Sequence, residues 1–198
     1  WGGSILNIYS DTPEIRRQIE FMKECQKQVK NILAICWGMQ VAVTAAGGEV
    51  KRGENGAHRG IAHDIIINKD GLSHPIYKGK KEIFNTPAFN YDEVVTLPEK
   101  SVLLSSNKVN RVMGLNFKTE KSNIWGIQYH PEITYDKMIT LIKFRKEKHI
   151  NNKSVNDEAD IISHIQRIEK EYKNRNNTNE RALFSRMRVS NHHQKCLI

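Results

Sequence analysis

A cysteine separates a short apolar run from a second, helix-like run, and this junction constrains the fold more than any other feature of the sequence. Residues 31–36 (Asn-Ile-Leu-Ala-Ile-Cys) show no polar alternation, which predicts a strand buried on both faces in the centre of a mostly parallel sheet. Residues 38–46 are small and apolar and predict a buried helix that ends at Gly47-Gly48. A strand that passes directly into a helix is typical of an α/β domain.

The surrounding sequence supports an α/β domain that extends to about residue 148. Thr12-Pro13 predicts the start of a helix that ends before Val29. Residues 112–117 and 124–128 predict a closing pair of strands, and residues 135–148 predict a helix. We therefore expect a first domain over residues 1–148.

Residues 149–198 predict an appendage to that domain. A polar linker is followed by one apolar stripe at helical spacing, formed by Ile161, Ile165, Ile168 and Tyr172. Such a stripe needs an apolar surface, either on its own domain or on a partner. Beyond Lys173 the sequence has no periodicity, which predicts a poorly ordered basic tail.

Composition narrows the classes of function. The 198 residues carry a net charge of +9, but the basic residues are spread along the chain, so solvated surface charge is favoured over a nucleic-acid interface. No run approaches the roughly 20 apolar residues of a membrane span. The three cysteines are too few for a disulfide scaffold, and we expect a cytoplasmic protein with no membrane partner.

Cys36 is the candidate nucleophile. Ala34 and Gly38 are small enough to permit a strained turn, and the amino end of the following helix favours a thiolate. The N–H of Trp37 can then donate to an oxyanion that forms beside the sulfur. The alternative interpretation is a buried, inert cysteine.

His130 and Glu132 supply the remaining groups of a candidate triad. His130 directly follows a predicted buried strand and could take the Cys36 proton and return one to a leaving group. Glu132 could accept from the far ring nitrogen and fix the tautomer. A histidine before a proline is alternatively structural.

The two motifs together, Cys36-Trp37-Gly38-Met39-Gln40 and Gln128-Tyr129-His130-Pro131-Glu132, resemble the class I (triad) glutamine amidotransferase family, in particular GMP-synthase-like members. The resemblance implies a flavodoxin-like, doubly wound sheet and hydrolysis of the glutamine side-chain amide through a γ-glutamyl thioester. It also implies transfer of ammonia to a synthase partner, without a metal or organic cofactor.

The same resemblance implies further site residues and shows departures. It places Gly3 as the second oxyanion donor, and Gln40, Tyr91 and Asp92 at the substrate. Asn90 stands where the family has a histidine, Ala34 where it usually has glycine, and the region of Arg59 lacks an expected glutamate. The first strands of the family's sheet are expected to be absent, which would leave strand 32–35 with an exposed edge.

Two alternatives to a glutamine amidotransferase therefore stay open. One is a γ-glutamyl hydrolase or peptidase, which uses the same triad on a substrate with a different leaving amine. The other is an inactive, truncated domain that serves as an interaction module through the helix of residues 155–172.

Overall fold

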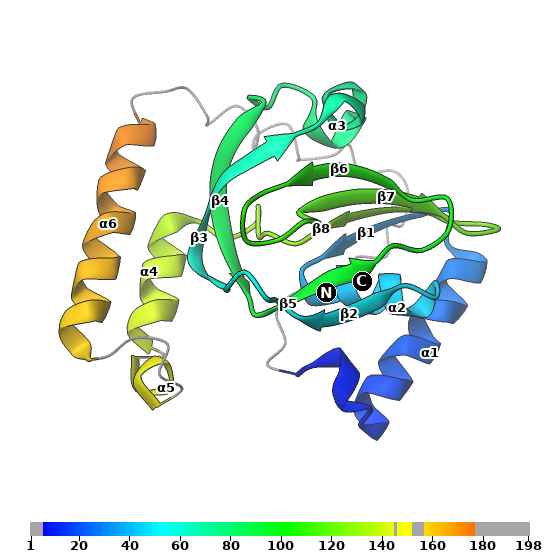
Figure 1. Cartoon of the computed structure of the whole chain (residues 1–198), viewed down its shortest axis with the longest axis horizontal. Coiled ribbons are helices and arrows are strands. Elements are labelled where there is room, and N and C mark those ends of the chain that lie inside the picture. Colours follow the sequence, from blue (N-terminus) through cyan, green and yellow to red (C-terminus); the bar gives the residue numbers. More distant parts are fainter. Residues whose placement is uncertain (1–5, 145, 152–156, 177–198) are drawn as a thin grey trace, which may run out of the picture. The chain divides into compact units, whose positions relative to one another are not determined.

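The computed structural model describes residues 6–144, 146–151 and 157–176, which fall into two compact units. The first unit comprises the described residues up to His130, and the second begins at Pro131. Figure 1 shows the elements of both units along the chain.

The first unit begins with two helices that flank a strand. After a short 3-10 turn, η1 (Ile8–Ser10), helix α1 (Pro13–Gln28) starts at Thr12, whose side chain accepts from the Ile15 N–H at 3.4 Å. Strand β1 (Asn31–Ile35) and helix α2 (Trp37–Ala45) follow. The helix predicted to end before Val29 and the strand-to-helix junction are both confirmed.

Six strands form the main sheet, in the order β1-β8-β7-β6-β3-β4. The other five strands of this sheet are β3 (His58–Ile67), β4 (Ile83–Asn90), β6 (Val102–Ser106), β7 (Gly114–Lys118) and β8 (Asn123–Ile127). A separate antiparallel pair consists of β2 (Glu49–Arg52) and β5 (Asp92–Thr96). Two short helical segments, α3 (Lys69–Ser73) and η2 (Pro75–Tyr77), lie between β3 and β4.

The α/β class is confirmed, but the sheet is mixed. Only β1 and β8 run parallel, while the other four adjacent pairs of the six-stranded sheet are antiparallel. Short connections such as residues 119–122 require antiparallel neighbours, because a parallel crossover needs a longer segment. Among the described strands β1 lies at an edge, and Leu33 and Ile35 are only half-buried. The predicted predominance of parallel pairs and the full burial of a central strand are therefore corrected, whereas the edge expected at strand 32–35 is found among the described strands.

The core of the first unit packs α1 and α2 against the sheet. Ile15 and Met22 of α1 and Met39 of α2 are fully buried. Gly126 of β8 allows α2 to approach closely, since a Cβ atom there would lie 2.7 Å from the Met39 Cγ. This close packing fixes the amino end of α2 above the strand ends.

The curl of the sheet brings β4 to the end of β8. In Figure 1 the long strands β3 and β4 run at a steep angle to the other strands. The backbone N–H of His130, three residues beyond β8, donates to the carbonyl of Pro87 in β4 at 2.8 Å. The carboxyl ends of β1 and β8 therefore meet β4, although β4 stands at the opposite end of the strand order.

The second unit is helical, with α4 (Tyr135–Phe144), α5 (Lys146–Asn151) and α6 (Glu158–Asn176). Helices α4 and α6 pack together, and the rings of Tyr135 and Tyr172 stack with centroids 5.4 Å apart. Ile161, Ile165 and Ile168 are buried, so the stripe predicted for this helix is found on one side. The domain boundary at residue 148 stays a prediction, and the predicted basic tail from 177 lies outside the described residues.

None of the helices described is long and apolar enough to cross a membrane.

Candidate active site

Cys36 occupies the turn between β1 and α2 in a strained backbone conformation. Its φ of 52° and ψ of −111° lie in a region that residues with a Cβ atom rarely adopt. The Cys36 N–H donates to the Ile127 carbonyl at 2.7 Å, and its carbonyl accepts from the Gln40 N–H at 3.1 Å. The strained elbow expected from the small neighbours is found, held by β8 on one side and by α2 on the other.

The amino end of α2 lies directly beside the cysteine. The first N–H groups of a helix have no partner within it, so the Trp37 N–H remains the predicted oxyanion donor. The indole Nε1 of Trp37 donates to the Gln18 Oε1 of α1 at 2.8 Å, which fixes this first turn. Gly3, the second predicted donor, lies outside the described residues.

Two groups of opposite polarity contact the sulfur. The Cys36 Sγ donates to the Phe89 carbonyl of β4 at 3.6 Å, and it accepts from the Gln128 Nε2 at 3.5 Å. Cys36 is buried, with 5% of its surface exposed. The thiol is therefore held at the end of β8, against β4.

His130 is anchored on the same strand. Its N–H bonds to Pro87, two residues before Phe89, and carbonyls two residues apart point to the same edge of a strand. The structure thus brings Cys36 and His130 to one edge of β4. Glu132 belongs to the second unit, so its place beside the imidazole stays a prediction.

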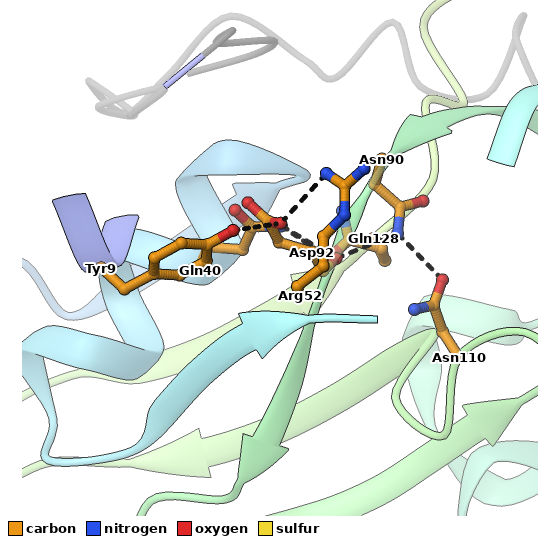
Figure 2. A network of polar contacts seen from close by, with 7 residues as sticks. All are labelled: Tyr9, Gln40, Arg52, Asn90, Asp92, Asn110 and Gln128. Atoms are coloured by element: carbon orange, nitrogen blue, oxygen red, sulfur yellow. Dashed lines mark hydrogen bonds and ion pairs between the residues drawn. The ribbon is translucent and has the colours of Figure 1, made fainter. Parts of the chain in front are cut away.

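Asp92, a predicted substrate contact, is buried at the start of β5. The hydroxyl of Tyr9 donates to its Oδ1 at 3.2 Å, and the Arg52 guanidinium lies 3.8 Å from the same oxygen (Figure 2). Burial raises the pKa of Asp92, and the Tyr9 hydrogen bond and the charge of Arg52 oppose this shift. The Asp92 carboxylate is therefore partly removed from water but keeps a hydrogen-bond donor and a positive charge beside it.

The other two predicted substrate contacts are Tyr91, the residue before Asp92, and Gln40 of α2. The ring of Tyr91 lies under the Arg52 guanidinium, 4.5 Å from centroid to Cζ, and Arg59 approaches the same ring at 5.9 Å. Gln40 Nε2 donates to the Asp92 backbone carbonyl and to the Gln128 Oε1, both at 3.3 Å. Gln40 and Asp92 are thus directly connected, as Figure 2 shows.

Several residues of this region have no role that the sequence predicts. Gln128 belongs to a motif without a function of its own there, and no sequence pattern indicates that Tyr9 and Arg52 contact Asp92. His58 lies opposite Asn90 in the register of β3 and β4, and their side chains bond at 2.9 Å. A glutamine at the end of an apolar run, two residues before the candidate histidine, is the one local signal that could indicate such a role.

Metal chemistry has no candidate site among the described residues, where no group of three or more His, Cys, Asp or Glu side chains could hold an ion.

The fold and the cysteine elbow define an α/β domain of the kind that presents a nucleophile at the end of a strand. The family model of class I glutamine amidotransferases matches residues 9–150, and the chain belongs to this family. The resemblance seen in the two motifs is thereby confirmed.

Curated relatives include enzymes named for γ-glutamyl amides or peptides and subunits of GMP synthases. A γ-glutamyl-L-1-hydroxyisopropylamide hydrolase from Pseudomonas sp. is 34% identical over 135 residues, which are 67% of this chain and 45% of the relative. One of the subunits of a glutamine-hydrolysing GMP synthase from Methanosphaera stadtmanae is 34% identical over 121 residues, 59% of this chain and 61% of the relative. The γ-glutamyl peptidase 4 of Arabidopsis thaliana is 30% identical, over 71% of this chain and 55% of its own length. The chain thus spans about half the length of these relatives.

Solved structures agree on the fold. A glutamine amidotransferase from Thermotoga maritima superposes with a TM-score of 0.68 at 20% identity, covering 86% of this chain and 69% of that one. A GMP synthase-type protein from Thermoplasma acidophilum gives a TM-score of 0.53 at 22% identity, covering 72% and 71%.

Proposed function

We propose that this chain hydrolyses the side-chain amide of glutamine through a thioester on Cys36 and supplies ammonia to a biosynthetic synthase partner. The observation that carries the proposal is the strained Cys36 elbow, with its sulfur on the edge of β4 that also anchors His130. Family membership supports the same chemistry. The relatives that are subunits of GMP synthases support a synthase as partner. We expect the site to act in the cytoplasm, where the thiol stays reduced.

In the first half of the reaction, His130 takes the Cys36 proton and the thiolate attacks the γ-carbonyl carbon. The N–H groups of Trp37 and Gly3 stabilise the oxyanion, and collapse of the intermediate breaks the C–N bond. The imidazolium gives its proton to the leaving group, which departs as ammonia. Glu132 holds the imidazole in the required tautomer.

In the second half, a water molecule gives its proton to His130 and attacks the thioester carbon. The C–S bond breaks, the sulfur recovers a proton from His130, and glutamate leaves. Asp92 accepts from the α-ammonium group of the substrate, while Gln40 and Tyr91 line the same site. No step requires a metal ion.

A second candidate function is hydrolysis of γ-glutamyl amides whose leaving group is a larger amine. Two of the relatives are named for such substrates, the Pseudomonas hydrolase and the Arabidopsis peptidase. Asn90, in place of the family's histidine, also changes the polar groups next to Asp92. The thioester chemistry is the same in both cases, so only the leaving group separates them.

A substrate comparison tests the proposal. The full chain is assayed for ammonia release from glutamine and for amine release from γ-glutamyl isopropylamide and γ-glutamyl dipeptides, with a sample alkylated by iodoacetamide as the blank. We expect glutamine to give the highest kcat/KM. A preference for the dipeptides or the alkyl amide would favour the second function, and the absence of both products would favour the interaction module.

A further inference from the structure

We propose that Gln128 is a positioning residue that directs an N–H group at the Cys36 sulfur and thereby favours the thiolate. This inference rests on the proposed function, since it assigns a role within the same site. Gln128 is completely buried, one residue beyond β8, and its Nε2 lies 3.5 Å from the Cys36 Sγ.

The direction of the Gln128 amide follows from a group that can only accept. The backbone carbonyl of Asp92 accepts from the Gln40 side chain, so the atom of Gln40 that faces it must be the nitrogen. That same nitrogen faces one end of the Gln128 amide, which must therefore be the oxygen. The other end of Gln128, the one that faces the sulfur, is then the N–H donor. Figure 2 shows Gln40, Asp92 and Gln128 in this arrangement.

Each of the two partners of the sulfur stabilises one of its two charge states. The Phe89 carbonyl accepts the S–H proton and therefore stabilises the thiol. When that proton passes to His130, the carbonyl has no proton to accept, whereas the Gln128 N–H still donates to the sulfur. A hydrogen bond to a charged acceptor is stronger than one to a neutral acceptor, so the Gln128 N–H stabilises the thiolate once it has formed.

Burial makes this donor difficult to replace. Water has no access to a side chain with 0% exposure, so removal of the Gln128 amide leaves the thiolate without that hydrogen bond. The loss of the N–H should appear in the chemical step, because this group contacts the nucleophile, whereas the Gln128 oxygen contacts Gln40 and neither end of the amide contacts the Asp92 carboxylate assigned to the substrate's ammonium.

Gln128→Met tests the inference, because methionine keeps the length and loses the donor to the sulfur, together with the oxygen that accepts from Gln40. The readouts are the iodoacetamide alkylation rate of the peptide that carries Cys36, at neutral pH, and the separate kcat and KM values for glutamine. We expect both the alkylation rate and kcat to fall about tenfold, with KM changed less than about threefold.

Gln26→Met is the matched control. Gln26 is also buried, and its Nε2 donates to the Ala42 carbonyl of α2 at 2.9 Å, so its substitution removes a comparable amide from the same core without touching the sulfur. We expect Gln26→Met to lower the melting temperature and leave the alkylation of Cys36 unchanged. An equal fall in alkylation in the two variants would overturn the inference by showing a general packing effect.

Gln128→Glu decides the matter if the methionine variant does not fold. It keeps an oxygen for Gln40 but places a second carboxylate oxygen at the sulfur, so alkylation should fall further than in Gln128→Met. Wild-type alkylation rates in either folded variant would reject the role of Gln128. If the wild type hydrolyses no glutamine while alkylation still depends on Gln128, the proposed function fails and the positioning role stands.

Discussion

Two chains of hydrogen bonds, which we call arms, meet at the backbone carbonyl of Asp92. They have opposite effects on the titratable group at their other end. The nucleophile arm runs through Gln40 and Gln128 to Cys36. The histidine arm runs through Asn90 to His58, since the Asn90 Nδ2 donates to the same carbonyl at 3.0 Å and the Asn90 Oδ1 faces the His58 Nδ1. Both arms are buried and built largely of side-chain amides.

The histidine arm holds its imidazole in one neutral form. Because the Asn90 nitrogen faces a carbonyl, its oxygen must accept from the His58 Nδ1. Asn107 uses its oxygen to accept from the N–H groups of Val109 and Asn110, so its nitrogen donates to the His58 Nε2 at 3.0 Å. Burial lowers the pKa of His58, and the hydrogen bond to Asn90 only partly opposes that shift.

The comparison shows how the same amide groups can serve opposite purposes. The Cys36 sulfur has one partner for the thiol and one for the thiolate, so it can change its charge without losing all of its hydrogen bonds. The His58 Nε2 has a donor as its partner, so protonation would break that hydrogen bond. We infer that the nucleophile arm takes part in the chemistry and that the histidine arm holds Asn90 and the start of β5 at Asp92 in place.

The largest effect is expected at the end of the nucleophile arm. Cys36→Ala should lower the glutamine hydrolysis rate at least about a thousandfold, because only the sulfur can form the thioester. Cys25→Ala is the matched control, since Cys25 is the other cysteine among the described residues and lies buried on α1. Ammonia assays and thermal melts measure both variants. If Cys36→Ala keeps an activity within tenfold of the wild type, Cys36 is not the nucleophile, and the two arms do not differ in the way proposed.

Substitution of the two remaining triad candidates should lower kcat to different extents. His130→Ala should lower kcat by about a thousandfold, since it removes the group that exchanges protons with the sulfur and the substrate. Glu132→Gln should cost less, because the carboxylate only orients the imidazole. Steady-state kcat values compare the two, and the reverse order would reject these roles.

Asp92, where the two arms meet, should control the pH dependence of substrate binding. Protonation of its carboxylate removes the partner of the substrate's ammonium, so KM should rise as the pH falls. Burial raises the pKa of Asp92, so the rise should begin at a higher pH than for an ordinary aspartate. Measurement of KM against pH tests this.

Tyr9→Phe sharpens the Asp92 experiment. The Tyr9 hydroxyl donates to the Asp92 Oδ1 and favours the ionised form, so its removal should move the rise in KM to still higher pH. The kcat value at high pH should stay near that of the wild type. Identical KM profiles for wild type, Tyr9→Phe and Asp92→Asn would show that Asp92 does not contact the substrate.

The smallest effect is expected in the histidine arm and concerns stability. The pKa of His58 is lower in the folded than in the unfolded chain, so the unfolded chain binds the proton at a higher pH. The free energy of unfolding should therefore decrease as the pH falls from the ordinary pKa of 6.5 towards the lower pKa of the folded chain. His58→Gln keeps a donor and an acceptor without a titratable group. It should flatten this slope, at a cost of about 1 kcal/mol at neutral pH.

Urea unfolding across this pH range measures the effect, with kcat as the control. We expect kcat of His58→Gln to stay within about threefold of wild type if the arm only supports the site. An unchanged pH slope, or a large loss of kcat with an intact fold, would contradict the proposed division between the two arms.

The extent to which the sequence predicted this site follows from how local each feature is. The elbow at Cys36 and the start of α1 at Thr12 depend on neighbouring residues, and both were predicted. The contact of Cys36 with Phe89 depends on a sheet that curls until β4 meets the end of β8, which no local pattern encodes.

The same reasoning explains the features that were missed. Gln128 and Gln40 lie far apart in the sequence, so only the folded chain shows that the two amides bond to each other and one of them to the sulfur. His58 faces Asn90 through the register of two antiparallel strands, and register is set by the whole sheet. The single apolar run of residues 31–36, which predicted a central strand, likewise could not indicate which strands pair with it.

The most direct test of this account is detection of the covalent intermediate. The chain is mixed with glutamine, quenched in acid within its first turnovers, digested and examined by mass spectrometry. We expect a peptide containing Cys36 that carries one γ-glutamyl group, which hydroxylamine removes and which His130→Ala does not accumulate. Ammonia release without any adduct on Cys36, or with the adduct on Cys25, would contradict the assignment of the nucleophile.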